Sequence, residues 1–173
     1  MGQKRIPLCN PVPLPPGYRS ELEQAVLQVL RSGTYSGGPQ VEALELELAA
    51  AAGMPYCAGV SNGTDALWLV GAALGIGPGD VVFVPAFTFL ATAEAFALLG
   101  AAIEFVDVTE ETATLCPRSL EQAVARCERQ GTGIPKAVIA VDLFGHPADY
   151  GALLPFCRDH QLLLVRDGAQ SFG

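Results

Sequence analysis

Residues able to bind an anion gather in the segment Ser61–Asp65, which reads Ser-Asn-Gly-Thr-Asp and precedes an alanine- and leucine-rich stretch. If that stretch is a helix, the backbone N–H groups of its first turn and the positive end of its dipole favour a bound anion. The Thr64 hydroxyl adds a further donor. From this loop alone, a phosphate site at Gly63 and Thr64 and an ordinary helix N-cap at Thr64 or Asp65 are equally supported.

Two further segments with chemical potential lie close after apolar runs. Phe87 and Phe89 belong to Pro-Ala-Phe-Thr-Phe, where a planar ligand could stack, although such aromatic residues are more often part of a core. Asp167 lies just beyond the apolar run Leu162–Val165. A carboxylate there is costly unless it meets a cation or several donors, or caps a helix. Gln170 follows three residues later and offers an amide.

Other kinds of site have less support. A Walker A phosphate loop needs a lysine, and the chain has lysines only at Lys4 and Lys136. The glycines of Gly75–Gly79 precede an apolar run, which indicates a helix stop and a turn and not a dinucleotide fingerprint. His146 has no partner at a catalytic spacing, so we interpret it as a solvated turn residue.

The composition indicates a substantial core and an acidic chain. Half of the 173 residues are hydrophobic, and 18 acidic against 10 basic residues give a formal charge of −8. This charge argues against a nucleic-acid partner. Gly, Pro, Asn or Thr interrupts every long uncharged stretch, so we expect no membrane span. Five cysteines without a Cys-x-x-Cys pair, and no secretory signal, favour a reduced cytoplasmic protein without a metal site.

Alternating apolar and amphipathic segments predict an α/β fold. Ser20 and Glu23 predict a capping box for a first helix that ends at Gly33, and a second helix follows Pro39 and ends at Gly53. The later segments predict strands near Cys57–Ser61, Val81–Pro85, Ile103–Val106, Ala137–Val141 and Leu162–Arg166, and helices over Thr64–Leu74, Thr88–Leu99, Ser119–Arg129 and Ala148–His160. Successive β-α-β units predict a mostly parallel sheet with helices on both faces.

The three loops should meet at one edge of this sheet, because ligands bind at the C-terminal ends of parallel strands. Together they offer an anion site, an aromatic ring that could stack on a ligand, and an acid followed by an amide three residues later. Pyridoxal 5'-phosphate (PLP) requires this set: a helix N-terminus for its phosphate, an aromatic contact for its ring, and a carboxylate that keeps its pyridinium nitrogen protonated. A dinucleotide would instead require a glycine-rich first turn.

The ordered motifs resemble the DegT/DnrJ/EryC1/StrS family of PLP-dependent, fold-type I sugar aminotransferases. The likeness is carried by Ile6-Pro7-Leu8, Ser32–Tyr35, Gly38-Pro39, Val60–Leu67, Ala73–Asp80, Pro85–Phe89, Ala91-Thr92-Ala93, Phe105–Val108, Gly145–Asp149 and Asp167–Gly173. The resemblance implies that Gly63 and Thr64 hold the cofactor phosphate with Asp65 beside them. It also implies that Phe89 stacks on the cofactor ring.

The same resemblance assigns the remaining site residues and the substrates. Asp167 would pair with the pyridinium nitrogen, and Gln170 would hydrogen-bond the ring hydroxyl oxygen. Tyr35 and Ser36 lie where the family shapes its substrate entrance, often against a second subunit, which implies a homodimer for the full-length protein. Family members take an amino group from glutamate and transfer it to a nucleotide-linked keto sugar, for amino-sugar, cell-surface polysaccharide or antibiotic-sugar biosynthesis.

The sequence departs from the family pattern in several places. The family usually has an acid at the position of Arg166 and alanine at that of Gly168. Because Arg166 neighbours Asp167 on a strand, we expect its side chain on the opposite face of the sheet. The family's Schiff-base lysine lies beyond the Asp-x-x-Gln segment and therefore beyond Gly173. Neither lysine of the chain is placed to replace it, so no catalytic residue is assigned.

These departures predict an incomplete enzyme. We expect residues 1–16 to form an extended Pro-rich arm and residues 17–173 to be the N-terminal portion of the PLP-binding large domain, a fold-type I domain incomplete at its C-terminus. The rest of that domain and a small C-terminal domain would be encoded further on, and the chain alone would be inactive. Two alternatives stay open: a related PLP-dependent sugar dehydratase, with histidine at the lysine position, and an inactive truncated product with a binding or regulatory role.

Overall fold

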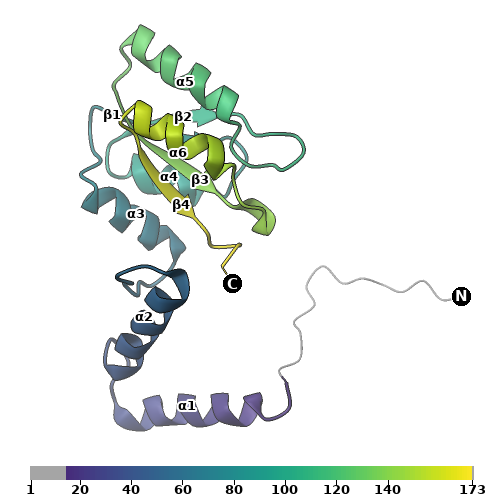
Figure 1. Cartoon of the computed structure of the whole chain (residues 1–173). Helices are drawn as coiled ribbons and strands as arrows, with labels where there is room; N and C mark the ends of the chain where they lie inside the picture. Colours follow the sequence, from purple (N-terminus) through teal and green to yellow (C-terminus); the bar gives the residue numbers. More distant parts are fainter. Residues whose placement is uncertain (1–14, 173) are drawn as a thin grey trace, which may run out of the picture. The chain divides into compact units, whose positions relative to one another are not determined.

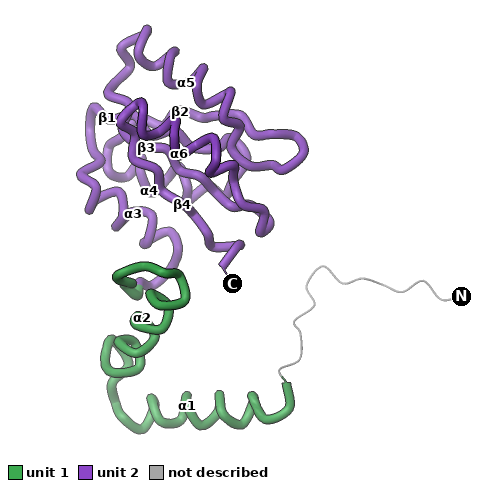
Figure 2. The backbone as a smooth tube through the Cα atoms, viewed as in Figure 1, with its two compact units in different colours: residues 1–59 green, residues 60–173 purple. Residues whose placement is uncertain are grey.

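A computed structural model describes residues 15–172 and divides the chain into two compact units, residues 1–59 and 60–173 (Figure 2). Of the arm expected over residues 1–16, all but Pro15 and Pro16 lie outside the described residues. In the described part of the chain, no helix is long and apolar enough to cross a membrane.

The described part of the first unit contains two helices, α1 (Tyr18–Ser32) and α2 (Pro39–Ala52) (Figure 1). The predicted helix ends at Gly33 and Gly53 are confirmed, because both glycines are left-handed C-caps. The predicted capping box is wrong. The helix α1 begins at Tyr18, whose N–H donates to the Pro15 carbonyl at 3.1 Å, so Ser20 lies within the first turn and caps nothing.

The strand predicted over Cys57–Ser61 is also wrong. This segment has neither strand nor helix structure, and none of the described strands pairs with it. A strand exists only through hydrogen bonds to a neighbouring strand. Here the N–H of Gly59 instead donates to Oε1 of Glu45 in α2, at 2.7 Å.

The second unit is built on a parallel sheet, which confirms the predicted α/β class. Its four described strands lie in the order β2-β1-β3-β4, and every pair is parallel. The strands are β1 (Asp80–Pro85), β2 (Ala102–Val106), β3 (Ile134–Val141) and β4 (Leu163–Asp167), and the helices are α3 (Gly63–Ala73), α4 (Ala91–Ala97), α5 (Pro117–Gln130) and α6 (Tyr150–Asp159). A 3-10 turn, η1 (Leu143–Gly145), follows β3.

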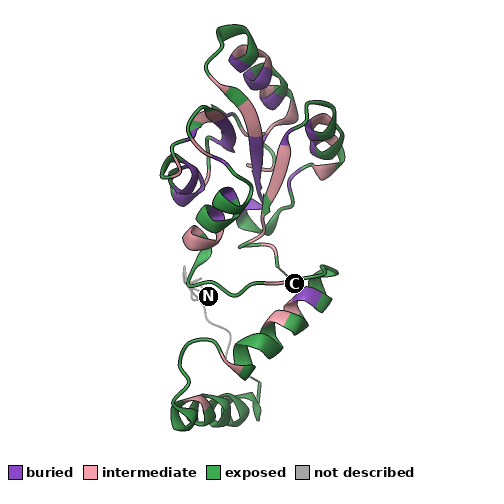
Figure 3. Cartoon of the chain, turned by 90° about the vertical axis from the view of Figure 1, so that its left-hand side faces the viewer, coloured by how far each residue is buried: buried purple, intermediate pink, exposed green. Residues whose placement is uncertain are grey.

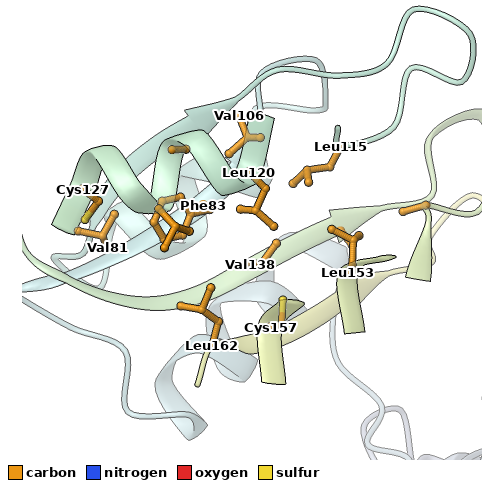
Figure 4. Packing of buried hydrophobic residues seen from close by; sticks show 14 residues of the cluster. Val81, Phe83, Val106, Leu115, Leu120, Cys127, Val138, Leu153, Cys157 and Leu162 are labelled. Carbon is orange, nitrogen blue, oxygen red and sulfur yellow. The ribbon is translucent and has the colours of Figure 1, made fainter. Parts of the chain in front are cut away.

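Helices cover both faces of the sheet, as predicted (Figure 1). Buried residues gather along the central strands and on the helices packed against them (Figure 3). On one face, Phe83 and Val138 pack with Leu120 of α5 and Leu153 of α6 (Figure 4). Their burial removes apolar surface from water, at about 25 cal/mol per Å², and is the main force holding these layers together.

The other face of the sheet carries α3 and α4. Val84 and Ile139 pack there with Leu67 of α3 and Phe96 of α4. Helices α3 and α4 approach closely at Gly71, where an added Cβ would lie 3.0 Å from Cδ1 of Phe96 in α4. This packing fixes the start of α3 beside the C-terminal ends of the strands.

The alternation of side chains along β4 places its last two residues on opposite faces. Leu163 and Val165 pack on the α3 and α4 side, whereas Leu164 packs on the α5 and α6 side. By the same alternation Asp167 belongs to the α3 side and Arg166 to the α6 side. The arginine therefore avoids the face that Asp167 occupies, as expected.

Candidate functional site

A pocket of about 220 Å³ lies where three strands end and α3 begins. Its lining comes from four segments that are far apart in the sequence: Gly63, Thr64 and Leu67 in α3; Thr88, Phe89, Ala91 and Thr92 after β1; Val141 and Leu143 at and beyond the end of β3; and Asp167, Ala169 and Gln170 at and beyond the end of β4. Five of the six residues assigned to the cofactor thus line one pocket. The parallel topology gathers them, because all these strands end at one edge of the sheet.

The start of α3 forms one wall of the pocket. Asn62 is the N-cap, and its Oδ1 accepts a hydrogen bond from the Asp65 N–H at 2.8 Å. The N-cap considered at Thr64 or Asp65 is therefore wrong. The N–H groups of Gly63 and Thr64 are in the first turn of the helix, where the backbone has no intrahelical acceptor for them. They are available to an anion in the pocket.

Asp65 is the assigned residue that does not line this pocket. Its Oδ2 accepts hydrogen bonds from the Ser61 hydroxyl and, at 3.0 Å, from Nδ2 of Asn62. The carboxylate thus holds the turn that precedes α3. Its assigned role beside the phosphate stays a prediction.

The segment after β1 supplies an aromatic ring and two hydroxyl groups. Phe89 lines the pocket and is 74% exposed, so its ring has a free face. Thr88 and Thr92, which sequence reasoning did not select, also line it and share a hydrogen bond of 3.0 Å between their hydroxyls. Phe87 lies outside the lining and instead meets Phe144, with ring centroids 6.2 Å apart and planes tilted by 60°.

The segment after β4 places an acid and an amide at the pocket. Oδ1 of Asp167 accepts a hydrogen bond from the Ala169 N–H at 3.1 Å. Oε1 of Gln170 accepts one from the Phe144 N–H at 2.5 Å. The Gln170 amide therefore has its Nε2 hydrogens left to donate, whereas Asp167 can accept from a protonated partner.

Beside the pocket, Asp142 is fully buried and was missed by sequence reasoning. Its carboxylate accepts hydrogen bonds from the Tyr150 hydroxyl at 2.7 Å, the Ala148 N–H at 3.0 Å, Nε of Arg166 at 2.8 Å and the Ser171 hydroxyl at 2.7 Å. The sequence nevertheless contains a feature that points to Asp142. Asp142 directly follows the apolar strand β3, as Asp167 ends β4.

Hydrogen bonds keep Asp142 ionised despite its burial. Burial alone would raise its pKa, but the bonds from Tyr150, Ala148, Ser171 and Arg166 outweigh it, and the pKa of Asp142 is lowered. The ion pair also raises the pKa of Arg166. The Arg166 guanidinium lies over the Tyr150 ring, 5.4 Å from its centroid. Arg166, which stands where the family usually has an acid, thus forms an ion pair with the buried Asp142.

Several residues singled out in the sequence are not among those that line the pocket. Tyr35 and Ser36 belong to the first unit, where the exposed Tyr35 hydroxyl donates to the Leu30 carbonyl at 3.2 Å. His146 is exposed and does not line the pocket. Lys136 is the third residue of β3, five positions before Val141, which pairs in register with Asp167. At about 3.3 Å per residue, this separates Lys136 from the level of Asp167 by about 16 Å.

The residues at the pocket fit the groups of PLP. The α3 amides and the Thr64 hydroxyl suit a phosphate, and an added Cβ at Gly63 would meet no atom within 4 Å, so the approach to these amides is open. Asp167 and Phe89 suit a protonated aromatic nitrogen and its ring. Among the described residues, no group of three or more His, Cys, Asp or Glu side chains is placed to hold a metal ion.

Known proteins share both the sequence and the fold of this chain. The chain is 43% identical over 155 residues to UDP-2-acetamido-2-deoxy-3-oxo-D-glucuronate aminotransferase of Pseudomonas aeruginosa, a match that covers 90% of this chain and 41% of that protein. It superposes on the crystal structure of a DegT DnrJ EryC1 StrS aminotransferase from Brucella abortus with a TM-score of 0.86 at 40% identity, covering 88% of this chain and 41% of that one.

A third similar structure contains a cofactor. The crystal structure of ntda from Bacillus subtilis, with bound cofactor PMP, has a TM-score of 0.84 at 26% identity, and the match covers 99% of this chain and 39% of that chain. The chain thus spans about two fifths of the length of the proteins it matches.

The family profile extends this likeness over most of the chain. It matches residues 16–173, which include every segment that lines the pocket. The chain belongs to the DegT/DnrJ/EryC1/StrS aminotransferase family.

Proposed function

We propose that this chain binds PLP in the pocket at the start of α3, as part of an aminotransferase that transfers an amino group from glutamate to a nucleotide-linked keto sugar. The observation that carries the proposal is that Thr64, Phe89, Asp167 and Gln170, from three separate segments, line one pocket. A fold alone does not imply function, but this combination of groups matches the phosphate, ring and nitrogen of one cofactor.

The start of α3 would hold the phosphate. The N–H groups of Gly63 and Thr64 and the positive end of the helix dipole stabilise a doubly charged anion without a lysine or arginine. The Thr64 hydroxyl supplies another donor. Asn62 and Asp65 keep the turn in shape through their mutual hydrogen bonds.

Asp167 and Gln170 would set the protonation of the ring. Bound PLP supplies an electron sink that stabilises negative charge on the carbon next to the reacting nitrogen. Asp167 would hold a proton at the ring nitrogen, because a carboxylate facing that nitrogen favours its charged form. Gln170 would donate from Nε2 to the ring hydroxyl oxygen, since its own oxygen already accepts the Phe144 N–H.

Phe89 and the Thr88–Thr92 pair would shape the remaining walls. The exposed ring of Phe89 offers a flat apolar surface to one face of the cofactor. The buried Thr92 hydroxyl bonds to Thr88 and so keeps the segment after β1 against the pocket.

The substrates and assembly are proposed from the relatives. The Pseudomonas protein is named for a UDP-linked oxo sugar, which supports a nucleotide-linked keto sugar as acceptor. We infer glutamate as the amino donor, a homodimer as the working form of the whole protein, and Tyr35 and Ser36 as contributors to the substrate entrance.

Binding of pyridoxamine 5'-phosphate by the 173-residue chain tests this proposal. This probe has the phosphate, ring nitrogen and hydroxyl of the cofactor but no aldehyde, so it forms no imine with lysines. Trp68, the single tryptophan, lies in α3 and reports binding through quenching of its emission. We expect Asp167→Asn to weaken binding about tenfold, because it replaces a charge-assisted hydrogen bond with a neutral one.

Asp107 provides the matched control. It directly follows β2 at the same edge of the sheet but does not line the pocket. Asp107→Asn should bind the probe as the unaltered chain does. Equal affinity of the Asp167→Asn variant and the unaltered chain would contradict the assignment of Asp167, and an absence of saturable quenching would contradict cofactor binding by this chain.

A further inference from the structure

Two loops meet beside the pocket, one after β3 and one after β4. The pocket residue Asp167 ends β4, and the loop that follows carries the pocket residue Gln170. The loop after β3 begins with Asp142, which is fully buried and does not line the pocket. The contacts between these two loops hold Asp167 and Gln170 in place at the pocket.

The Asp142 carboxylate links the two loops directly. Its Oδ2 accepts hydrogen bonds from Nε of Arg166 at 2.8 Å and from the Ser171 hydroxyl at 2.7 Å. Nη2 of Arg166 also donates to the Ser171 hydroxyl oxygen at 3.2 Å. The three side chains are therefore all hydrogen-bonded to one another. Arg166 and Ser171 stand on either side of the segment 167–170, so both ends of that segment are tied to one buried oxygen.

The backbone adds two bonds between the same loops. The Asp142 N–H donates to the Asp167 carbonyl at 3.0 Å, and the Phe144 N–H donates to Oε1 of Gln170. A displacement of the loop after β4 would therefore break bonds to both pocket residues. Within the loop, Asp167 accepts from Ala169 and the Ser171 N–H donates to the Gly168 carbonyl at 3.0 Å, so the segment is a closed turn.

The other oxygen of Asp142 is held from the opposite side. Oδ1 accepts hydrogen bonds from the Tyr150 hydroxyl at 2.7 Å and the Ala148 N–H at 3.0 Å, at the start of α6. These bonds orient the carboxylate, and neither donor belongs to the loop after β4. Asp142 is thus a fixed acceptor, because an ionised buried carboxylate must keep its donors.

We propose that Asp142 is a positioning residue for the cofactor site, acting through Ser171 and Arg166 to hold Asp167 and Gln170 at the pocket. This inference rests on the proposed function, since it gives those two residues a ligand to meet. It assigns no chemical step to Asp142, which touches neither the pocket nor any reacting atom.

Two single-hydroxyl variants separate positioning from ordinary stabilisation. Ser171→Ala and Tyr150→Phe each remove one hydroxyl donor to Asp142, but only Ser171 belongs to the loop after β4. Hydrogen exchange at the amides of residues 168–170 measures the order of that loop without any cofactor. Titration with pyridoxamine 5'-phosphate, followed through Trp68, measures the site.

We expect Ser171→Ala to speed exchange at residues 168–170 and to weaken probe binding, each by about tenfold or more, as loss of one hydrogen bond to a charged group predicts. Tyr150→Phe should change each by less than about twofold, even where it lowers the melting temperature. Asp142→Asn should change exchange and probe binding more than Ser171→Ala does. If Asp142→Asn does not fold, the comparison of Ser171→Ala with Tyr150→Phe is sufficient.

Two results would overturn the inference. One is Ser171→Ala with exchange and binding equal to those of the unaltered chain. The other is Ser171→Ala and Tyr150→Phe with equal losses, which would make Asp142 a structural residue without a bias toward this loop. If the unaltered chain does not bind the probe, the proposed cofactor site fails, and the exchange comparison still decides whether Asp142 orders the loop.

Discussion

The backbone N–H of Phe144 donates to Oε1 of Gln170 across 2.5 Å, which joins the turn after β3 to an amide side chain of the pocket. Because Phe144 occupies the amide oxygen, Gln170 faces the pocket as a donor through Nε2. An oxygen atom of a ligand, and not an N–H group, is therefore the partner this side chain can meet.

Gln170→Glu tests that donor role. Glutamate has nearly the same shape and can still accept the Phe144 N–H, but it has no donor and adds a negative charge near Asp167. We expect binding of pyridoxamine 5'-phosphate to weaken about tenfold or more, measured through Trp68 emission. Gln122→Glu adds the same charge on the exposed surface of α5 and should have no effect. Unchanged binding in the Gln170→Glu variant would show that Gln170 is not a donor to the ligand.

Gly145→Ala should destabilise the contact between the two loops. Gly145 has φ of +80°, and an added Cβ would lie 3.1 Å from the Gln170 carbonyl oxygen. Gly131, at the end of α5, has φ of +61° with no atom within 4 Å of an added Cβ. Gly131→Ala therefore incurs only the backbone cost, about 1 kcal/mol, while Gly145→Ala should lose about 1 kcal/mol more in urea unfolding. Equal losses would contradict the close approach at Gly145.

Asp142 should make stability depend on pH in the acidic range. Its pKa is lowered in the folded chain, so its stabilising effect is fully present above the unfolded pKa, about 4, and is lost as the pH falls through the folded value. The free energy of unfolding should exceed that of Asp142→Asn by about 2 kcal/mol between roughly pH 6 and 8. Urea titrations should show the difference shrinking below about pH 4. A difference that widens on acidification would contradict the ionised state of Asp142.

Two cysteines of the second unit should differ in reactivity. Burial raises the pKa of the Cys157 thiol to about 11. Burial also acts to raise that of Cys116, but hydrogen bonds at the start of α5, chiefly from Ser119, lower its pKa overall. Because the thiolate is the reactive form, iodoacetamide at pH 8 should modify Cys116 at least about tenfold faster than Cys157, as peptide mapping by mass spectrometry can measure. In concentrated urea the two rates should converge; equal rates in the folded chain would contradict the packing around Cys157.

Much of the fold could be predicted because local patterns specify it. The runs Val81–Pro85 and Ala137–Val141 are apolar throughout, as strands covered on both faces must be, and both form central strands. The α3 segment and the acid at the end of β4 were identified by the same reasoning. These features depend on neighbouring residues, whose types are visible in the sequence.

The two wrong predictions arise where contacts beyond the local sequence pattern determine the structure. The Cys57–Ser61 segment has the residue types of a strand, but pairing requires a partner that residue types cannot supply, and Gly59 bonds to Glu45 instead. Ser20 and Glu23 match a capping box, yet the turn at Pro15–Gly17 starts α1 three residues earlier than that box would. In both cases a contact outside the local pattern decided the outcome.

By itself the sequence determined the α/β class, the order of strands and helices from Val81 onward, and the residue types able to meet a phosphate and a protonated ring nitrogen. Only the tertiary structure decided that these residues line one pocket while Asp65, whose carboxylate bonds to Ser61, is not part of the lining. It also decided the role of Asp142, whose donors Arg166 and Ser171 lie 24 and 29 positions further along the chain. The reason is physical: a buried carboxylate is tolerated only where folding brings enough donors to it, and those donors come from another strand and its loop.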